Sequence, residues 1–332
     1  MGKKILIIRT SSLGDLVHML PAISDIAANV PGAQIDWIVE EAFTEIPAWH
    51  PAINEVIPVS HRRWRKSWWS AQTRAERASL RKNLAARKYD VVLDMQGLMK
   101  SVWLIRQTSG KRHGLNLTSA REPLASFFYD VKHTVKFWQP AVTRQRTLAS
   151  LAFEYEYSGP PNFGLQSITN NAQTGQYAVI MPSASRPDKL WAESDWRIVF
   201  DYLIQNGMHI KLLSGSQEEL NRANILVKGY ENAEVLPRMS LTEVAHLIAG
   251  SRIMVGLDSG LTHLSAGLGR PTIGIYIAST PVRTPLEGSS YTASLGERGS
   301  PPSSQTVLAA IDQALSFEPQ GTNDTDNNAP AV

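Results

Sequence analysis

The stretch that decides the fold is KKILIIRTSSLGDL, residues 3–16. Its apolar run Ile5–Ile8 is typical of a short strand buried on both faces, and small polar residues follow it directly. Gly14 then permits a tight turn or the close approach of a ligand, and Asp15 stands where a helix is expected to begin. This order predicts backbone N–H groups and a carboxylate at the carboxyl end of a parallel strand, where open α/β sheets bind ligands.

The same pattern recurs about 240 residues later in MVGLDSGLTHL, residues 254–264. Asp258, Ser259 and Gly260 stand between an apolar strand and a predicted helix, and His263 lies one turn inside that helix. Two such edges predict two doubly wound α/β domains that face each other across a cleft. A cleft of this kind suits an enzyme that joins two substrates.

The 332-residue length also favours two domains, and the composition changes between them. Residues 158–175 are rich in Pro, Gly, Asn, Gln and Ser, which is typical of a connecting segment. We therefore expect Rossmann-like domains over residues 1–160 and 176–317, with a linker at 161–175. The polar tail 318–332 is expected to be disordered.

Strands and helices are expected to alternate in both halves. The predicted strands are Ile5–Arg9, Ile35–Val39, Glu55–Val59, Asp90–Asp94, Lys111–Leu115, Ala178–Met181, Ile210–Ser214, Glu234–Leu236, Ile253–Gly256 and Thr272–Tyr276. The predicted helices start near Asp15, Ala71 and Met99 in the first half, and cover Ser194–Asn206, Glu218–Gly229, Leu241–Ala249, Leu261–Leu268 and Ser303–Phe317 in the second.

Composition excludes several classes of protein. The chain has no cysteine, which removes disulfides and thiolate chemistry and fits a reducing compartment. Ile5–Ile8 is too short for the core of a signal peptide, and no run approaches the ~18 apolar residues of a membrane span. A net charge of +3 is too small to indicate a nucleic-acid binder by itself. These features favour a cytoplasmic enzyme.

The first turn supports two interpretations of Asp15. Residues 10–15 match neither the G-x-G-x-x-G of dinucleotide folds nor a P-loop, so NAD binding and ATP hydrolysis lose support. An acidic residue in the first turn of a helix stabilises the helix dipole. The alternative is a general base in the cleft that deprotonates an acceptor hydroxyl.

The second half carries further candidates, each with a structural alternative. The loop at Ser259 and Gly260 suits a diphosphate at a helix N-terminus, although Ser259 also fits a helix cap. Lys189 follows a strand, where a cation would meet phosphate, or it is a solvated lysine. Glu219 either binds ribose hydroxyls or caps the helix that follows. His263 is either packed or a ligand contact.

A basic, tryptophan-rich segment lies in the first half. Residues 61–88 contain ten Lys or Arg but a single acid, Glu76. Arginines among tryptophans suit an acidic amphipathic partner, and we favour a carbohydrate or lipid over single-stranded nucleic acid. Two rival functions stay open on these features: a non-hydrolysing sugar-nucleotide epimerase and an RNA-binding protein.

Six ordered motifs give the chain a resemblance to a known family. They are RTSSLGD at 9–15, DWIVEE at 36–41, RRWRK at 62–66, DMQGL at 94–98, AREPLAS at 120–126 and DSGLTHL at 258–264. The chain closely resembles the bacterial ADP-heptose-dependent heptosyltransferases of lipopolysaccharide core biosynthesis, up to about Phe317. The RRWRK and AREPLAS motifs favour the branch that adds the first heptose, and a heptosyltransferase II-like enzyme stays open as an alternative.

The resemblance implies a GT-B fold: an acceptor domain, an ADP-sugar domain and a cleft between them. It implies inverting transfer of L-glycero-D-manno-heptose from ADP-heptose to the first Kdo of Kdo2-lipid A, without a metal or other cofactor and without nucleic acid. It also implies an enzyme held peripherally at the cytoplasmic face of the inner membrane.

The family's functional residues map onto this chain by motif. Asp15 takes the place of the catalytic base, and Ser12 and Gly14 belong to its turn. The donor-binding positions are Ser185, Lys189, Glu219, Asp258, Ser259, Gly260 and His263. The acceptor-binding positions are Arg62, Arg63, Lys66 and Arg121.

Two departures from the family pattern concern the donor pocket. Ala184-Ser185 replaces a threonine pair that touches the donor phosphates, so one hydroxyl donor is lost. Ile277-Ala278 replaces a Gly-Pro after the last predicted strand.

Overall fold

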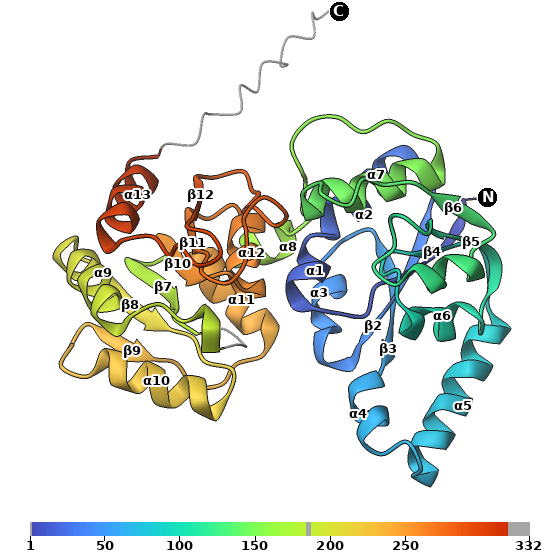
Figure 1. Ribbon diagram of the computed structural model, residues 1–332, viewed down its shortest axis with the longest axis horizontal. Coiled ribbons are helices and arrows are strands. Elements are labelled where there is room, and N and C mark those ends of the chain that lie inside the picture. Colours follow the sequence, from blue (N-terminus) through green and yellow to red (C-terminus); the bar gives the residue numbers. More distant parts are fainter. Residues whose placement is uncertain (1, 184–186, 318–332) are drawn as a thin grey trace, which may run out of the picture.

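The computed structural model describes residues 2–183 and 187–317. Two lobes lie side by side, and each is built on its own parallel sheet (Figure 1). The predicted α/β class and the two doubly wound domains are therefore confirmed. The exact boundaries 1–160, 161–175 and 176–317 stay predictions, and the expected disordered tail lies outside the described residues.

The N-terminal sheet has the strand order β3-β2-β1-β4-β5-β6 and is parallel throughout. The strands are β1 (Lys4–Ile8), β2 (Gln34–Glu40), β3 (Ile53–Val59), β4 (Lys88–Asp94), β5 (Ser109–Leu115) and β6 (Val131–His133). The central strand β1 is fully buried from Ile5 to Ile8, as its uninterrupted apolar run predicts.

The C-terminal sheet repeats this topology in the order β9-β8-β7-β10-β11-β12. Its strands are β7 (Tyr177–Met181), β8 (His209–Leu212), β9 (Ala233–Val235), β10 (Ile253–Leu257), β11 (Thr272–Ile275) and β12 (Thr292–Leu295). Counted from its own first strand, each sheet has the order 3-2-1-4-5-6. In both domains the order reverses beside the first strand, which is where doubly wound folds bind ligands.

Helices cover both faces of each sheet (Figure 1). The first lobe contains α1 (Leu13–Val17), α2 (Leu20–Asn29), η1 (Glu41–Phe43), α3 (Glu45–Ala48), α4 (His61–Lys66), α5 (Ala71–Ala86), α6 (Met99–Ile105), η2 (Pro123–Phe128) and α7 (Ala141–Phe153). The second contains α8 (Gln166–Thr169), η3 (Pro187–Lys189), α9 (Glu193–Gln205), α10 (Gln217–Val227), α11 (Leu241–Gly250), α12 (Gly260–Gly267) and α13 (Ser304–Ser316).

The segment between the sheets is packed. Phe163, Leu165 and Ile168 are buried in an apolar core that continues from the first domain into the second. Ser167 also donates a hydrogen bond of 2.8 Å to the backbone oxygen of Trp49 in the first domain. Because the segment is polar overall, its sequence did not indicate that these three apolar residues are buried. The segment therefore joins the two domains through packing contacts as well as through the chain.

Candidate active site

The turns after β1 and β10 meet at the domain interface. Helix α1 packs against α12, so the two predicted ligand-binding edges face each other. A Cβ atom on Gly260 would lie 2.4 Å from Leu13 Cδ2 and 2.7 Å from the Gly14 nitrogen. Glycine is therefore required at 260 for this close approach. Gly14 lies inside α1, so of the two roles that we left open for it the tight turn is not formed, and the close approach of a ligand stays a prediction.

Asp15 is held by contacts on both carboxylate oxygens. Its Oδ2 accepts hydrogen bonds from the Ser12 backbone nitrogen at 2.8 Å and from Ser12 Oγ at 3.0 Å. Its Oδ1 lies 2.7 Å from Arg9 Nη2. Burial raises the pKa of Asp15, but the Arg9 charge, the Ser12 hydrogen bonds and nearby His18 outweigh burial and lower it to about 2. The carboxylate is thus ionised at neutral pH and 40 % exposed.

The end of β4 fixes the residues beside Asp15. Arg9 donates to the backbone oxygen of Met95. Gln96 Oε1 accepts from the Thr10 nitrogen and hydroxyl, both at 2.8 Å, and its amide donates to the Ser11 oxygen at 2.9 Å. The first turn therefore cannot move independently of β4. This explains why a glutamine in the DMQGL motif lies at the site.

Lys189 and His263 both contact the carboxylate of Asp258. Lys189 Nζ lies 2.8 Å from Oδ2, and His263 Nε2 lies 3.2 Å from Oδ1. Ser279 donates to Oδ2 as well, at 2.5 Å. Burial raises the pKa of Asp258, but His263, Lys189 and Ser279 together hold it well below its usual range. The carboxylate of Asp258 therefore fixes the position of the Lys189 ammonium at the end of β10.

A cavity of about 350 Å³ brings the two turns together; we call it the Asp258 cavity. The predicted site residues that line it are Ser12, Gly14, Asp15, Lys189, Glu219, Asp258, Ser259, Gly260 and His263. Ser185 and the Ala184 departure lie outside the described residues.

Glu219 and Ser259 also have the capping roles that we left open. The Ser259 side chain accepts from the Thr262 nitrogen at 3.4 Å and caps α12. Glu219 accepts a 2.6 Å hydrogen bond from the Gly215 nitrogen, just before α10. Both residues line the Asp258 cavity, so the structural and the ligand-binding interpretations are compatible.

Among the lining residues of this cavity that were not predicted, His18 and Ser183 have buried polar atoms without a partner in the described parts of the chain. His18 is buried, its ring packs edge-on against His263 at 4.4 Å, and neither ring nitrogen has a hydrogen-bond partner within residues 2–183 and 187–317. Burial, followed by the charge of His263, lowers the pKa of His18 to about 3, so the ring is neutral. The Ser183 hydroxyl is likewise buried and unpartnered among the described residues. Such groups mark a surface built to receive a polar ligand.

A second cavity of about 440 Å³ adjoins the first; we call it the Arg144 cavity. Asp15 and Lys189 line both cavities, so they stand at the junction. The predicted Arg121 lines the Arg144 cavity, and so does Ala278, where the chain departs from the family pattern. Arg144 and Arg283 also line it and were not predicted.

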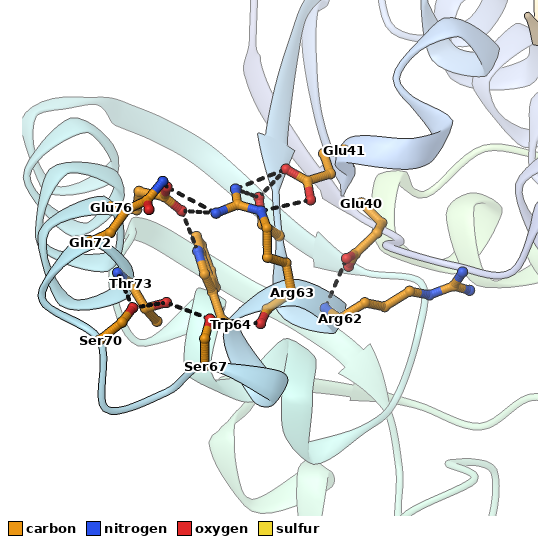
Figure 2. Close-up of polar contacts among 11 residues, drawn as sticks. Glu40, Glu41, Arg62, Arg63, Trp64, Ser67, Ser70, Gln72, Thr73 and Glu76 are labelled. Carbon is orange, nitrogen blue, oxygen red and sulfur yellow. Dashed lines mark hydrogen bonds and ion pairs between the residues drawn. The ribbon is translucent and has the colours of Figure 1, made fainter.

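The predicted basic segment separates into different environments (Figure 2). Arg63 forms ion pairs with Glu41 at 3.0 Å and Glu76 at 2.8 Å, whereas the Arg62 side chain extends away from them. The Arg63 hydrogen bonds lower the pKa of Glu76 to about 2. Arg63 thus joins α4 to α5, and its predicted acceptor contact would require it to leave two carboxylates.

A third cavity, of about 430 Å³, lies under the basic segment; we call it the Trp103 cavity. Arg62 and Lys100 line it together with several aromatic rings, and Ser11 lies in its wall beside the first turn. Lys66 is exposed and lines none of the three cavities. Trp68 and Trp69 are 53 % and 71 % exposed, so neither belongs to the core.

No group of three or more His, Asp or Glu side chains that could hold a metal ion occurs within the described ranges. The helices of those ranges also include none long and apolar enough to cross a membrane.

Comparisons with known proteins agree with this geometry. Lipopolysaccharide heptosyltransferase 1 of Escherichia coli K12 is 45 % identical over 285 residues, which are 84 % of this chain and 89 % of that protein. The structure of E. coli heptosyltransferase WaaC with ADP is 40 % identical, with a TM-score of 0.88, over 94 % of this chain and 99 % of that chain. WaaC with ADP-2-deoxy-2-fluoro heptose has a TM-score of 0.86, over 93 % and 99 %.

Two doubly wound domains with a carboxylate and a lysine at facing switch points define a GT-B glycosyltransferase. The chain belongs to glycosyltransferase family 9 (heptosyltransferase), whose profile matches residues 77–309. Family membership sets aside the epimerase and the RNA-binding protein.

Proposed function

We propose that the chain transfers L-glycero-D-manno-heptose from ADP-heptose to the first Kdo of Kdo2-lipid A in lipopolysaccharide inner-core biosynthesis. The single observation that carries this proposal is the junction of two cavities at Asp15 and Lys189. A carboxylate and an ammonium group in the lining of the same two cavities match the two charges that develop in glycosyl transfer. The relatives bound to ADP and to a fluorinated ADP-heptose support the choice of donor.

The reaction is a single inverting displacement. Asp15 accepts the proton of the acceptor hydroxyl while the hydroxyl oxygen bonds to the anomeric carbon. The bond from that carbon to the ADP oxygen breaks on the opposite face, and ADP leaves with the bonding electrons. Arg9 and Ser12 fix the orientation of the Asp15 carboxylate.

The departing diphosphate is stabilised from the C-terminal domain. Lys189 supplies a positive charge, and the backbone N–H groups at the start of α12 supply oriented dipoles. Asp258 and His263 position Lys189 and the cavity wall, and they need not contact the donor directly. Glu219 is assigned to the donor ribose and Ser185 to the donor phosphates.

These protein groups take the part that a metal plays in many transferases, so we propose that the reaction needs no metal or other cofactor.

The acceptor enters from the N-terminal domain. Arg121 in the Arg144 cavity and Arg62 in the Trp103 cavity face the expected path of an acidic acceptor, and exposed Lys66 lies on α4 beside Arg62. Arg63 joins them only by exchanging its carboxylate partners for the acceptor.

The same surface supports the proposal that the enzyme binds peripherally to the cytoplasmic face of the inner membrane. Trp68 and Trp69 are exposed beside a run of bases, a combination that suits an anionic lipid interface. This places the lipid-borne acceptor beside the N-terminal domain, and it assigns no role to nucleic acid.

The proposal is tested with purified enzyme, ADP-heptose and deacylated Kdo2-lipid A. Mass spectrometry of the product is expected to show one added heptose, and NMR is expected to show an inverted anomeric configuration. An unmodified acceptor, or retention of configuration, would contradict the proposal. Peripheral binding is tested by sedimentation with anionic vesicles, where Trp68→Ser with Trp69→Ser is expected to stay in the supernatant.

A further inference from the structure

The Arg144 cavity carries more positive charge than the proposed reaction uses. Its described lining includes six cations, Arg9, Arg121, Arg144, Lys189, Arg283 and Arg298, and one carboxylate, Asp15. Asp15 is paired with Arg9, and Lys189 is paired with Asp258. In the parts of the chain that the structure describes, the remaining four arginines have no carboxylate partner.

Arg144 and Arg283 meet at one aromatic ring although they come from different domains. The Arg144 guanidinium lies 5.4 Å from the centre of the Phe137 ring, and that of Arg283 lies 4.4 Å from it. The Arg283 backbone oxygen accepts a 2.8 Å hydrogen bond from Ala141, the first residue of α7. The loop after β11 is therefore fastened to the N-terminal domain beside the two charges.

Two guanidinium groups so placed repel each other unless an anion lies between them. Burial lowers the pKa of Arg144, and the positive charges of Arg283 and Arg9 lower it further. Arg144 is nevertheless anchored, because it donates to the backbone oxygens of Lys136 at 2.7 Å and Ser119 at 3.1 Å. The charge is thus held in the cavity wall rather than free to turn into solvent.

The cavity has a further unsatisfied group. The Oε1 atom of Gln139 is buried and has no hydrogen-bond partner within the described residues. Gln139 precedes α7 and lines the same cavity as Arg144. A buried acceptor beside two unpaired cations fits a ligand that carries both hydroxyl and acidic groups, as an acidic sugar does.

We propose that Arg144 and Arg283 bind an acidic group of the acceptor, a carboxylate or a phosphate, at the wall of the Arg144 cavity formed by α7 and the loop after β11. This inference rests on the proposed function. The donor diphosphate is matched by Lys189 and the start of α12, which leaves the acceptor as the source of this second anion. Because the two arginines come from different domains, the bound anion bridges them and couples acceptor binding to the contact between the domains.

The test compares Arg283→Gln, Arg144→Gln and the double variant with the wild type. Arg238→Gln is the control, since Arg238 is an exposed arginine of the same domain that lines none of the three cavities. Arg283 forms no side-chain hydrogen bond or ion pair within the described ranges, so Arg283→Gln is expected to fold normally. Thermal melting checks the fold of Arg144→Gln, which loses two anchoring bonds.

We expect the KM for the acceptor to rise about ten-fold or more in each single variant, with the KM for ADP-heptose unchanged. In the double variant the acceptor KM should rise by less than the product of the two single-variant increases, because one anion contacts both residues. Arg283→Lys should recover part of the loss. Two modified acceptors, one with its carboxylates amidated and one without its phosphates, identify the acidic group that Arg283 binds. With the acceptor that lacks this group, Arg283→Gln and the wild type should have the same acceptor KM.

An acceptor KM within two-fold of the wild type in Arg283→Gln, or a rise in the donor KM alone, would overturn the inference. Calorimetric binding of deacylated Kdo2-lipid A to the wild type and to Arg283→Gln decides the question independently of turnover. If the wild type shows no transfer, the proposed function fails, and the binding comparison still tests this site.

Discussion

Asp15 occupies a position at which a structural role and a catalytic role are both possible. It is the third residue of α1, where its carboxylate caps the helix through Ser12. It also lines both cavities of the interdomain cleft. The sequence leaves the two roles open because a first-turn acid is common in either case. The structure shows the capping contact with Ser12 and a place in the wall of both cavities, and the catalytic role of Asp15 stays a proposal.

Asp15→Asn separates these roles. We expect it to lower kcat by about 10²–10⁴-fold while donor binding is retained, because the proton acceptor is lost and the size of the side chain is kept. Asp195→Asn is a matched control, since Asp195 is the third residue of α9 and lines none of the three cavities. The control should cost only about 0.3–1 kcal/mol of stability and leave turnover unchanged. Near-normal turnover of Asp15→Asn would remove the catalytic role.

The low pKa of Asp15 leads to a second prediction, about its ionisation. Because the Arg9 charge and the Ser12 hydrogen bonds favour the ionised form, the carboxylate should keep its charge as the pH falls from 8 to 4. Its carboxyl ¹³C resonance, assigned from Asp15→Asn, should not titrate in that range. Arg9→Gln should move the midpoint upward. A wild-type midpoint at pH 4 or above would show that the Arg9 contact does not form in solution.

Ser183 offers a substitute for the hydroxyl missing at Ala184. Its buried, unpartnered Oγ lines the Asp258 cavity one residue before that position. Ser183→Ala should raise the KM for ADP-heptose about two- to ten-fold by removing one hydrogen bond, and leave the acceptor KM unchanged. Ser304→Ala changes a buried serine outside the cavities and serves as the control. Equal donor KM values for both variants and the wild type would contradict the assignment.

At the scale of elements, α1 and α12 work as one unit. Their first turns touch, and a Cβ on Gly260 would collide with Leu13 and the backbone of Gly14. A Cβ on Gly14 would lie 3.4 Å from the Gly260 Cα, close to an ordinary contact. The two glycines look alike in the sequence, yet only Gly260 is sterically required.

Gly260→Ala is therefore expected to separate the helices, lower stability by about 1–3 kcal/mol and abolish most transfer. Gly14→Ala is the comparison and should melt near the wild-type temperature, because Ala suits a helical position. Both changes are measured by thermal melting and donor binding. If Gly260→Ala melts and binds donor like the wild type, the two helices are not held as closely as the structure shows.

The strands and helices differ in how well the sequence predicts them. Central strands such as β1 and β10 are buried on both faces and therefore read as uninterrupted apolar runs. The edge strands β6 and β12 have only three and four residues of intermediate or low burial, so they leave no such pattern. Helix α7 was also missed, and with it the cavity wall that carries Arg144.

The candidate site residues that stand just after a strand could be predicted from the sequence. Those that reach the site only through tertiary contacts were missed. Asp15, Lys189 and Asp258 each follow a buried strand, and doubly wound topology brings such ends together. The pairing of Arg63 with Glu41 and Glu76 joins three segments, and Arg144 meets Arg283 across 139 positions of sequence. No local sequence pattern predicts these contacts, because they depend on how distant segments pack in the fold.

On the scale of the whole molecule, two sheets of the same topology present their switch points to a common cleft. In the proposed mechanism the N-terminal domain supplies the base Asp15 and cationic side chains, and the C-terminal domain supplies Lys189 and a helix N-terminus. An apolar core runs from one domain to the other beside the cleft. On this proposal, transfer requires both substrates to be bound at the same time.

The most direct test of this account is ADP release from ADP-heptose in EDTA, with and without deacylated Kdo2-lipid A. The account predicts that release depends on the acceptor and survives EDTA, because Lys189 and α12 carry the charge of the departing diphosphate. Release that needs no acceptor, or that stops in EDTA and returns with a divalent cation, would contradict it.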